Sequence, residues 1–313
     1  MSYAAPMPGE SEALYGAIEA GGTKFVCAIA DGSGKILKEQ RFPTTDPGAT
    51  LEAAGEFLRE ASGRSQALSG IGIASFGPVH LRRDSHLYGC IGKTPKAGWS
   101  GTDMVGALAR QFSCPIGFDT DVNAAALAEH RWGAARDVDS MAYVTFGTGI
   151  GGGVISRGAP IHGLMHPEMG HMHPRRHPLD QGFAGVCPFH GDCLEGLASG
   201  PAIVARSGRE LKELDPSHPQ WQIEADYLAQ LCAQLVVMVS PQRIVLGGGV
   251  MNRSELLPLI RHRLLHWLGG YVDRTEILNS IDAYLVAPAL NAQSGVLGAV
   301  LLAMAASMRR NAK

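Results

Sequence analysis

The sequence predicts an α/β protein with two related lobes. Two stretches carry this prediction, because residues 16–31 and 140–156 each read as strand, glycine-rich turn and strand. The first continues through a third strand, a helix and a buried strand, so the chain opens in the order β-β-β-α-β. With 313 residues the chain can bury two separate cores. We therefore expect two lobes that face each other across a cleft.

Each element follows from the apolar pattern and from the residues at its ends. The elements predicted in the first half are the hairpin Gly16–Asp31, the strand Lys35–Phe42, the helix Thr50–Ser62, the strand Gly70–Ser75, a short strand ending at Phe118 and a helix from Asp121. Those in the second half are the strands Ser140–Phe146, Gly152–Ser156 and Arg243–Leu246 and the helices Leu194–Arg206 and Ser294–Arg310. We expect a small lobe of residues 1–121, completed by 294–313, and a large lobe of residues 122–293.

The composition is that of a soluble globular protein, with 45% hydrophobic residues, 18% charged residues and a net charge of −2. Positive charges are scattered, so a nucleic-acid partner is not expected. Residues 1–15 lack lysine and arginine, which argues against a signal peptide. The apolar segment Val296–Met308 is shorter than the roughly 18 residues that a membrane span needs. We expect a cytoplasmic protein without a membrane partner.

Three glycine turns follow apolar strands, at Gly21–Lys24, Gly147–Gly151 and Gly247–Gly249. Without a Cβ the backbone can approach an anion closely, and successive N–H groups can point at a phosphate. A tight hairpin is the alternative reading of each turn. The middle turn returns as a strand and does not open a helix, so it is not a dinucleotide-binding fingerprint.

Asp121 lies where a strand stops and a helix starts. Phosphoryl transfer to a hydroxyl needs a carboxylate within hydrogen-bond reach of that hydroxyl, so Asp121 is the candidate general base. The alternative is that Asp121 caps the helix, a function that Asp119 or Thr120 could also serve.

The stretch Ile161–Pro188 has no clear period and is rich in histidine. Two thiolates and two imidazoles, from His171, Cys187, His190 and Cys193, would complete a closed tetrahedral zinc site of structural type. His173 or His177 could replace His171, because spacing alone does not choose among them. The alternatives are a solvated histidine-rich loop or a redox pair of Cys187 and Cys193. The other four cysteines are expected in the core: Cys27, Cys90, Cys114 and Cys232.

Two carboxylates, Glu168 and Glu195, flank this cluster. Carboxylates beside a rigid metal site could accept hydrogen bonds from sugar hydroxyls. Glu195 could equally serve only to begin the helix that follows.

Five segments, in their chain order, resemble motifs of the ROK family of sugar kinases and repressors: Ile18–Lys24, Thr120–Ala126, Gly147–Gly151, Glu168–His171 and Val245–Gly249. The resemblance extends from Ile18 to about Arg309. It implies the two-lobed actin/hexokinase-like (ribonuclease H-like) phosphotransferase fold. It also implies phosphorylation of a free hexose by Mg-ATP, with Asp121 as the base.

The resemblance further assigns individual residues. ATP would bind at Gly21, Gly22, Thr23, Lys24, Gly147, Thr148, Gly149, Gly248 and Gly249. The sugar would contact Gly77, Thr120, Glu168, His171 and Glu195, and zinc would bind at His171, Cys187, His190 and Cys193. Glu19 stands where the family usually has an aspartate that helps to hold Mg²⁺. We also expect a homodimer.

Three departures from the family pattern favour its fructokinase branch over its glucokinase branch. Glu19 replaces the usual aspartate, Thr120 replaces the usual asparagine beside the base, and His190 replaces one cysteine of the usual zinc site. The segments Ser75–Pro78 and Thr94–Trp99 also resemble that branch. D-Fructose, converted to fructose 6-phosphate at its primary hydroxyl, is therefore the expected substrate.

Three other functions stay open. A kinase of the same family could act on glucose, mannose or an N-acetylhexosamine. A sugar-responsive repressor would need a DNA-binding unit before the first glycine turn, and only about 15 residues precede Gly16, too few for three helices. A sugar-binding protein without catalysis is the third, and ATP turnover would exclude it.

Overall fold

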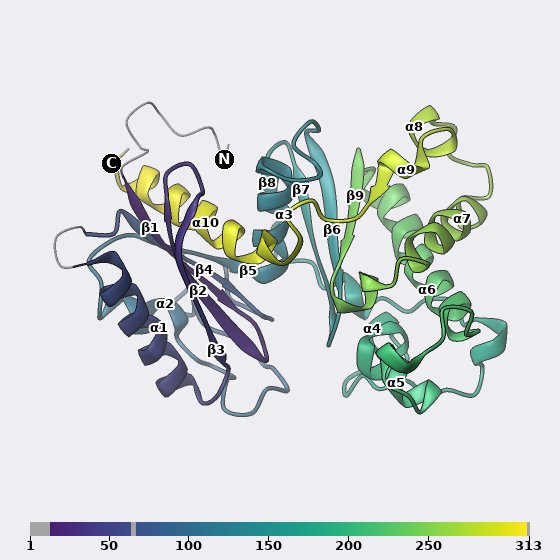
Figure 1. Ribbon diagram of the computed structural model, residues 1–313, viewed down its shortest axis with the longest axis horizontal. Helices are drawn as coiled ribbons and strands as arrows, with labels where there is room; N and C mark the ends of the chain where they lie inside the picture. Colours follow the sequence, from purple (N-terminus) through teal and green to yellow (C-terminus); the bar gives the residue numbers. More distant parts are fainter. Residues whose placement is uncertain (1–12, 64–66, 312–313) are drawn as a thin grey trace. The chain divides into compact units, whose positions relative to one another are not determined.

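The computed structural model describes residues 13–63 and 67–311 (Figure 1). The chain divides into two compact units. Unit 1 combines the residues up to Arg131 with Arg157–His166 and the segment from Ala292 onward, and unit 2 consists of Trp132–Ser156 and Pro167–Asn291. The division differs from the predicted boundary after residue 121, because the helix that starts at Asp121 and the segment 157–166 both fall in unit 1. The physical reason is that this helix packs on the C-terminal helix of the same unit.

Unit 1 is built on a five-stranded sheet in the order β3-β2-β1-β4-β5. The strands are β1 (Leu14–Ala20), β2 (Lys24–Asp31), β3 (Ile36–Pro43), β4 (Gly70–Ser75) and β5 (Ile116–Thr120). The pairs β1–β2 and β2–β3 are antiparallel, whereas β1–β4 and β4–β5 are parallel. The central parallel strand β4 is buried along its whole length, which explains its lack of charged residues.

Helices cover both faces of this sheet (Figure 1). They are α1 (Pro47–Ser62), α2 (Met104–Ala109), α3 (Asp121–Arg131) and α10 (Ser294–Asn311). The core on one face joins Leu51 and Leu58 of α1 to Ile71 and Ile73 of β4. On the other face a Cβ on Gly72 would lie 1.8 Å from the carbonyl oxygen of Ala299, so α10 can pack this closely only because β4 carries glycine there.

Helix α10 is apolar enough to be mistaken for a membrane span. By length and composition, residues Asn291–Arg310 pass as a candidate span, although the sequence segment 296–308 by itself is too short. In the structure 67% of the most apolar window is buried inside the protein. This burial is typical of the core helix of a globular unit, which is what the sequence predicts.

Unit 2 is built on a second sheet, in the order β10-β9-β6-β7-β8. Its strands in unit 2 are β6 (Ser140–Phe146), β7 (Ile150–Ser156), β9 (Arg243–Gly247) and β10 (Leu285–Val286), and its edge strand β8 (Ala159–Pro160) belongs to the segment Arg157–His166 of unit 1. The pair β6–β7 is antiparallel, and β6–β9 and β9–β10 are parallel. Read from β3 to β5 and from β8 to β10, the two sheets have the same strand order. The similarity between the two predicted hairpins therefore extends to the whole sheets.

The helices of unit 2 are α4 (Leu194–Ala198), α5 (Gly200–Ser207), α6 (Gln220–Val239), α7 (Leu256–Leu268), α8 (Thr275–Leu278) and α9 (Ile281–Tyr284). Its 3₁₀ turns are η2 (Met169–His171), η3 (Pro178–Asp180), η4 (Leu211–Glu213) and η5 (Gly249–Asn252), and η6 (Asn291–Gln293) begins at the last residue of unit 2 and ends in unit 1. The predicted helix Leu194–Arg206 is two helices. Ser199 leaves the helical conformation and its hydroxyl caps α5, whose first turn contains Pro201.

Candidate active site

The predicted site residues divide between the two units. Unit 1 holds Glu19, the turn Gly21–Lys24, Gly77, Thr120 and Asp121. Unit 2 holds the second and third glycine turns, the two glutamates and the histidine–cysteine cluster.

In unit 1 the three parallel strands β1, β4 and β5 end at one edge of the sheet. Ala20 pairs with Ser75, and Ser75 pairs with Thr120, so the residues that follow these strands lie next to one another. Gly21, Gly77 and Asp121 each follow one of the strands. The structure thus brings the first glycine turn and the candidate base to the carboxyl edge of one sheet, the edge at which α/β proteins commonly bind ligands.

The first glycine turn is a rigid hairpin with room beside it. The N–H group of Gly21 donates to the carbonyl oxygen of Lys24 at 3.0 Å, and the Thr44 hydroxyl donates to the carbonyl oxygen of Gly21 at 2.7 Å. A Cβ on Gly22 would meet nothing within 4 Å. The turn therefore combines a fixed backbone with the open space that an approaching phosphate needs.

Glu19 has a structural contact that the sequence does not reveal. Its carboxylate lies against the first turn of α10, where it accepts a hydrogen bond from the N–H group of Val296. A Cβ on Gly295 would come within 2.4 Å of the carboxyl carbon. Burial raises the pKa of Glu19, against the opposing charges of Lys24 and Arg41. The residue predicted to help hold Mg²⁺ is thus also tied to a helix N-terminus, where a carboxylate is stabilised.

Asp121 is the first residue of α3, and the cap of that helix is Thr120. The Thr120 hydroxyl accepts the N–H of Asn123 at 3.1 Å, which is the contact expected of an N-cap. Asp121 Oδ1 accepts the N–H of Val122 at 2.9 Å. Because Thr120 makes the capping contact, the N-cap reading of Asp121 loses its support.

Sequence reasoning missed a pair formed by Asp119, two residues before Asp121, and His162. The half-exposed His162 places Nε2 3.0 Å from Oδ2 of the buried Asp119, whose Oδ1 also accepts from Asn123 Nδ2 at 2.7 Å. The hydrogen bond to Asp119 raises the pKa of His162, against the effect of burial. The available signal was a histidine in the histidine-rich stretch, but its partner is 43 residues away in the sequence.

In unit 2 the second and third glycine turns lie at one edge of the second sheet. They follow the neighbouring parallel strands β6 and β9, in which Thr145 pairs with Gly247. Gly248 has a φ of 92°, and a Cβ there would lie 2.3 Å from the carbonyl oxygen of Phe146. Only glycine fits this approach, so the two turns are held against each other. A Cβ on Gly147 or on Gly249 would meet nothing within 4 Å.

Glu168 and Glu195 are near enough to affect each other. Burial, and next to it the charge of Glu195, raise the pKa of Glu168 to about 7. Glu195 lies in the first turn of α4, and its Oε2 accepts the N–H of Ile150 at 2.9 Å. Glu195 therefore joins the short helix to the start of β7, directly after the second glycine turn.

The side chains of His171, Cys187, His190 and Cys193 converge. Their ligand atoms all lie within 4.8 Å of one another. Nδ1 of His171 is 3.5 Å from Sγ of Cys193 and 3.9 Å from Sγ of Cys187. Tetrahedral zinc with Zn–S bonds near 2.3 Å and Zn–N bonds near 2.0 Å sets its sulfur and nitrogen ligands about 3.5 Å apart. The donor set and its spacing fit a closed structural zinc site, and among the alternatives His171 is the histidine that joins it.

The backbone around these ligands forms a small knot. Cys187 and Gly191 exchange two backbone hydrogen bonds, at 3.1 and 2.9 Å. Gly191 has a φ of 66°, and a Cβ on Gly196 would lie 1.9 Å from the carbonyl oxygen of Gly191. The N–H group of Leu194 donates to the carbonyl oxygen of Met172 at 2.7 Å, which ties the His171 end of the segment to α4.

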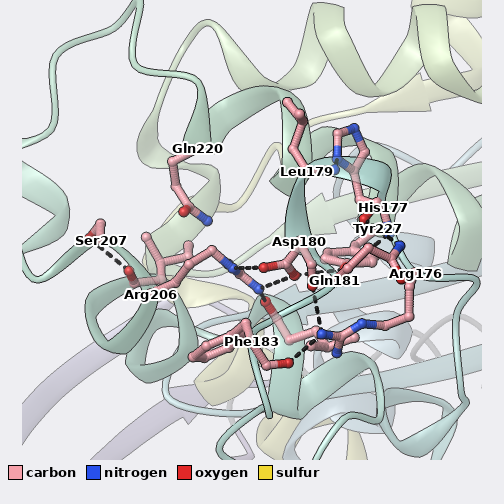
Figure 2. Close-up of polar contacts among 12 residues, drawn as sticks. Arg176, His177, Leu179, Asp180, Gln181, Phe183, Arg206, Ser207, Gln220 and Tyr227 are labelled. Carbon is pink, nitrogen blue, oxygen red and sulfur yellow. Dashed lines mark hydrogen bonds and ion pairs between the residues drawn. The ribbon is translucent and has the colours of Figure 1, made fainter.

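A buried ion pair anchors the segment between His171 and Cys187 to the helices of unit 2 (Figure 2). Asp180 pairs with Arg206 of α5, with oxygen–nitrogen distances of 2.8 and 3.0 Å. It also accepts the hydroxyl of Tyr227 of α6 at 2.7 Å. Sequence reasoning missed all three residues, because none belongs to a recognisable motif and the partners are 26 and 47 residues apart.

Two sheets of matching strand order, each ending in glycine turns, define the architecture of two-lobed sugar kinases with an actin-like fold. The crystal structure of a ROK hexokinase from Thermus thermophilus matches this chain with a TM-score of 0.75 at 27% identity. The match covers 96% of this chain and 100% of that chain. The predicted fold class is confirmed.

The family is shown by the sequence comparison. The model of the ROK family matches residues 15–306, so the chain belongs to the ROK family, as its motifs predict. A fructokinase of Zymomonas mobilis subsp. mobilis is 46% identical over 296 residues, with 94% of this chain and 97% of the relative covered. A fructokinase of Pediococcus pentosaceus is 43% identical over 293 residues, with 94% and 98% covered.

Proposed function

We propose that this protein is an ATP-dependent sugar kinase that converts D-fructose to fructose 6-phosphate. The observation that carries the proposal is the position of Asp121 at the head of α3, at the same edge of the sheet as the first glycine turn, in a chain 46% identical to a fructokinase. The same edge of the sheet thus holds a carboxylate suited to a base and a backbone turn suited to a phosphate.

In this proposal Asp121 accepts the proton of the primary hydroxyl as the hydroxyl oxygen attacks the γ-phosphorus of ATP. The bond from that phosphorus to the bridging oxygen breaks, and ADP leaves. In each unit the glycine turns offer backbone N–H groups to the phosphates of a nucleotide. Mg²⁺, when bound near Glu19, neutralises charge on the phosphates.

The proposed sugar contacts of unit 2 are Glu168, His171 and Glu195, and those of unit 1 are Gly77 and Thr120. The zinc ligands His171, Cys187, His190 and Cys193 fix the segment that carries Glu168. With a pKa of about 7, Glu168 can donate as well as accept a hydrogen bond to a sugar hydroxyl near neutral pH. Zinc bound to four protein ligands has no open position for water, so its contribution is structural.

We also propose that the protein acts in the cytoplasm as a homodimer, in keeping with its composition. The dimer is checked by sedimentation equilibrium: a mass of about 66 kDa, twice the 33.1 kDa of one chain, is expected, and a mass of one chain would contradict it.

The decisive experiment measures ADP release by the purified, zinc-loaded protein with Mg-ATP and each of fructose, glucose, mannose and N-acetylglucosamine. We expect kcat/KM for fructose to exceed that for every other sugar. Faster turnover of another hexose would keep the kinase and replace the substrate. Absence of sugar-dependent ADP release from folded protein would overturn the proposed activity.

A further inference from the structure

Unit 2 contains a cavity of about 620 Å³ that none of the proposed catalytic residues lines. One wall is the chain segment 175–178 with Gln181, between the zinc ligands His171 and Cys187. The other wall is the end of α7, through Arg263, His266 and Trp267, and Asp226 of α6 completes the lining. The volume lies within the usual range of small-molecule sites.

The cavity is built from fixed parts. Gln230 of α6 clasps the backbone of Arg175, accepting its N–H at 2.7 Å and donating to its carbonyl oxygen at 2.9 Å. Figure 2 shows Arg176 held by the carbonyl oxygens of Asp180 and Phe183. The backbone of Arg175 and the side chain of Arg176 are therefore already held in place. This lowers the conformational entropy that is lost when a ligand binds.

The lining carries excess positive charge. Three arginines and one carboxylate, Asp226, line the cavity, and one of the arginines, Arg176, lies 3.7 Å from Oδ2 of Asp192 outside the lining. The Asp226 carboxylate is already engaged by neutral donors, Trp267 Nε1 at 3.1 Å and Gln230 Nε2 at 3.2 Å, and Arg263 Nε stands off at 3.9 Å. Within residues 13–63 and 67–311 the exposed guanidinium group of Arg175 has no ion-pair or hydrogen-bond partner. The cavity is therefore short of negative charge.

We propose that this cavity binds a phosphate-bearing small anion at a second site, separate from the catalytic one. The planar fork of a guanidinium group matches the oxygen atoms of a phosphate, and Arg175 and Arg263 supply two such forks from opposite walls. The cavity is larger than a bare phosphate needs. The indole of Trp267, fixed by Asp226, gives a surface for the organic part of a phosphate monoester.

The site would also touch the proposed catalytic machinery through the chain itself. Arg175 and Arg176 lie four and five residues after the zinc ligand His171, in the segment that Asp180 and Tyr227 anchor. An anion bound between this segment and α7 would restrain it.

The test is isothermal titration calorimetry of the zinc-loaded protein with inorganic phosphate and, separately, with fructose 6-phosphate. Saturating fructose and a non-hydrolysable ATP analogue are present throughout, so that the proposed catalytic site is occupied. We expect binding that the double variant Arg175→Gln/Arg263→Gln weakens by about ten-fold or more. The single variant Arg175→Gln, at an exposed position, covers the case in which the double variant folds poorly.

A matched control is Arg274→Gln, which removes an exposed arginine of unit 2 that does not line the cavity. It should bind as the wild type does, which separates a local site from the net charge of the protein. Binding of both ligands would show that the site recognises the phosphate group. Binding of fructose 6-phosphate without binding of inorganic phosphate would show that the site recognises the phosphate ester. Equal affinity in wild type and double variant, or no binding of either ligand, would overturn the proposal. A protein without kinase activity could still show the difference between variants, so this proposal and the proposed function can fail separately.

Discussion

At the scale of single residues, Asp121 is distinguished from its neighbours by what Thr120 does. Thr120 caps α3 through its hydroxyl, and Asp119 is buried beside His162 and Asn123. Of the two aspartates in this short run, Asp121 is thus the one that neither caps the helix nor belongs to the buried cluster. The hydrogen bond that Asp121 Oδ1 accepts from the N–H of Val122 is a local contact.

Asp121→Asn is expected to lower kcat by about two to four orders of magnitude or more, because the amide cannot accept the proton of the hydroxyl. Asparagine serves as well as aspartate at a helix N-terminus, so the melting temperature should change little. The measurement is ADP release, with nucleotide binding followed in parallel. Asp103→Asn, which keeps a true N-cap on α2, is the control and should turn over normally. Near-normal turnover of Asp121→Asn would remove the base assignment.

The pair of Asp119 and His162 gives a prediction about pH. Since Asp119 raises the pKa of His162, Asp119→Asn should return that pKa toward about 6.5. The stabilisation from a raised histidine pKa is fully present below about pH 6.5 and is lost as the pH rises through the folded-state value. The stability difference between wild type and variant should therefore shrink as the pH rises from 6 to 9.

The check is the titration of the His162 ring by NMR, together with unfolding at several pH values. Asp139→Asn, at an exposed position in the other unit, is the control and should leave the His162 titration in place. An unchanged His162 titration in Asp119→Asn would show that another group causes the shift.

At the scale of elements, the histidine–cysteine cluster fixes the segment before α4, and the glycines of β4 allow α10 to pack closely on the sheet. The knot of residues 187–193 begins α4, since Cys193 is the residue before its first turn. Because Glu195 follows in that turn, the metal site and a predicted sugar contact share one short helix.

Cys193→Ser is expected to lose bound zinc, since a hydroxyl is a poor substitute for a thiolate in a closed site. The segment that carries Glu168 should then lose order, and the melting temperature should fall. Elemental analysis after dialysis measures the zinc, and hydrogen exchange of residues 168–195 measures the order. Cys114→Ser, which changes a thiol outside the cluster, should keep its zinc. Full zinc content in Cys193→Ser would contradict the ligand set.

Gly72→Ala is expected to destabilise unit 1 by about 1–3 kcal/mol or more, because the new methyl group would lie 1.8 Å from a backbone oxygen of α10. A flexible side chain cannot relieve this contact, and the strand or the helix must move. Thermal unfolding measures the effect. Gly163→Ala, where a Cβ would meet nothing within 4 Å, is the control in the same unit and should melt close to the wild type.

At the scale of the whole molecule, the sequence predicted the fold class, the family and most strands. The hairpins and β4 were predictable because their apolar runs end in glycine turns, and β6 was predicted with its observed bounds. The break between α4 and α5 was missed, since the apolar spacing runs on through Ser199. The observed extent of unit 1 was also missed, because the packing of α3 on α10 joins segments more than 160 residues apart, as in the contact of Glu129 with Ser294.

The candidate site was predictable where chemistry is local in the sequence. The histidine–cysteine cluster and the glycine turns could be predicted because spacing and residue type restrict them, although spacing did not choose among His171, His173 and His177. The pair of His162 with Asp119 and the anchor of Asp180, Arg206 and Tyr227 could not be found, because each joins distant segments through single contacts. The cavity lined by Arg175 and Trp267 could not be predicted either, because its lining also comes from segments that are far apart in the sequence.

Because α10 is at the C-terminal end of the sequence, unit 1 is completed only after unit 2 has been synthesised. Residues 292–311 close one face of the first sheet, yet the ribosome makes them after every residue of unit 2. At about 5–20 residues per second, roughly ten seconds or more separate β4 from the helix that covers it. Through that interval the glycine face of β4 and β5 lacks the helix that packs against its glycines. A nascent chain stalled before residue 292 should therefore bind chaperones through unit 1, while unit 2 already resists proteolysis.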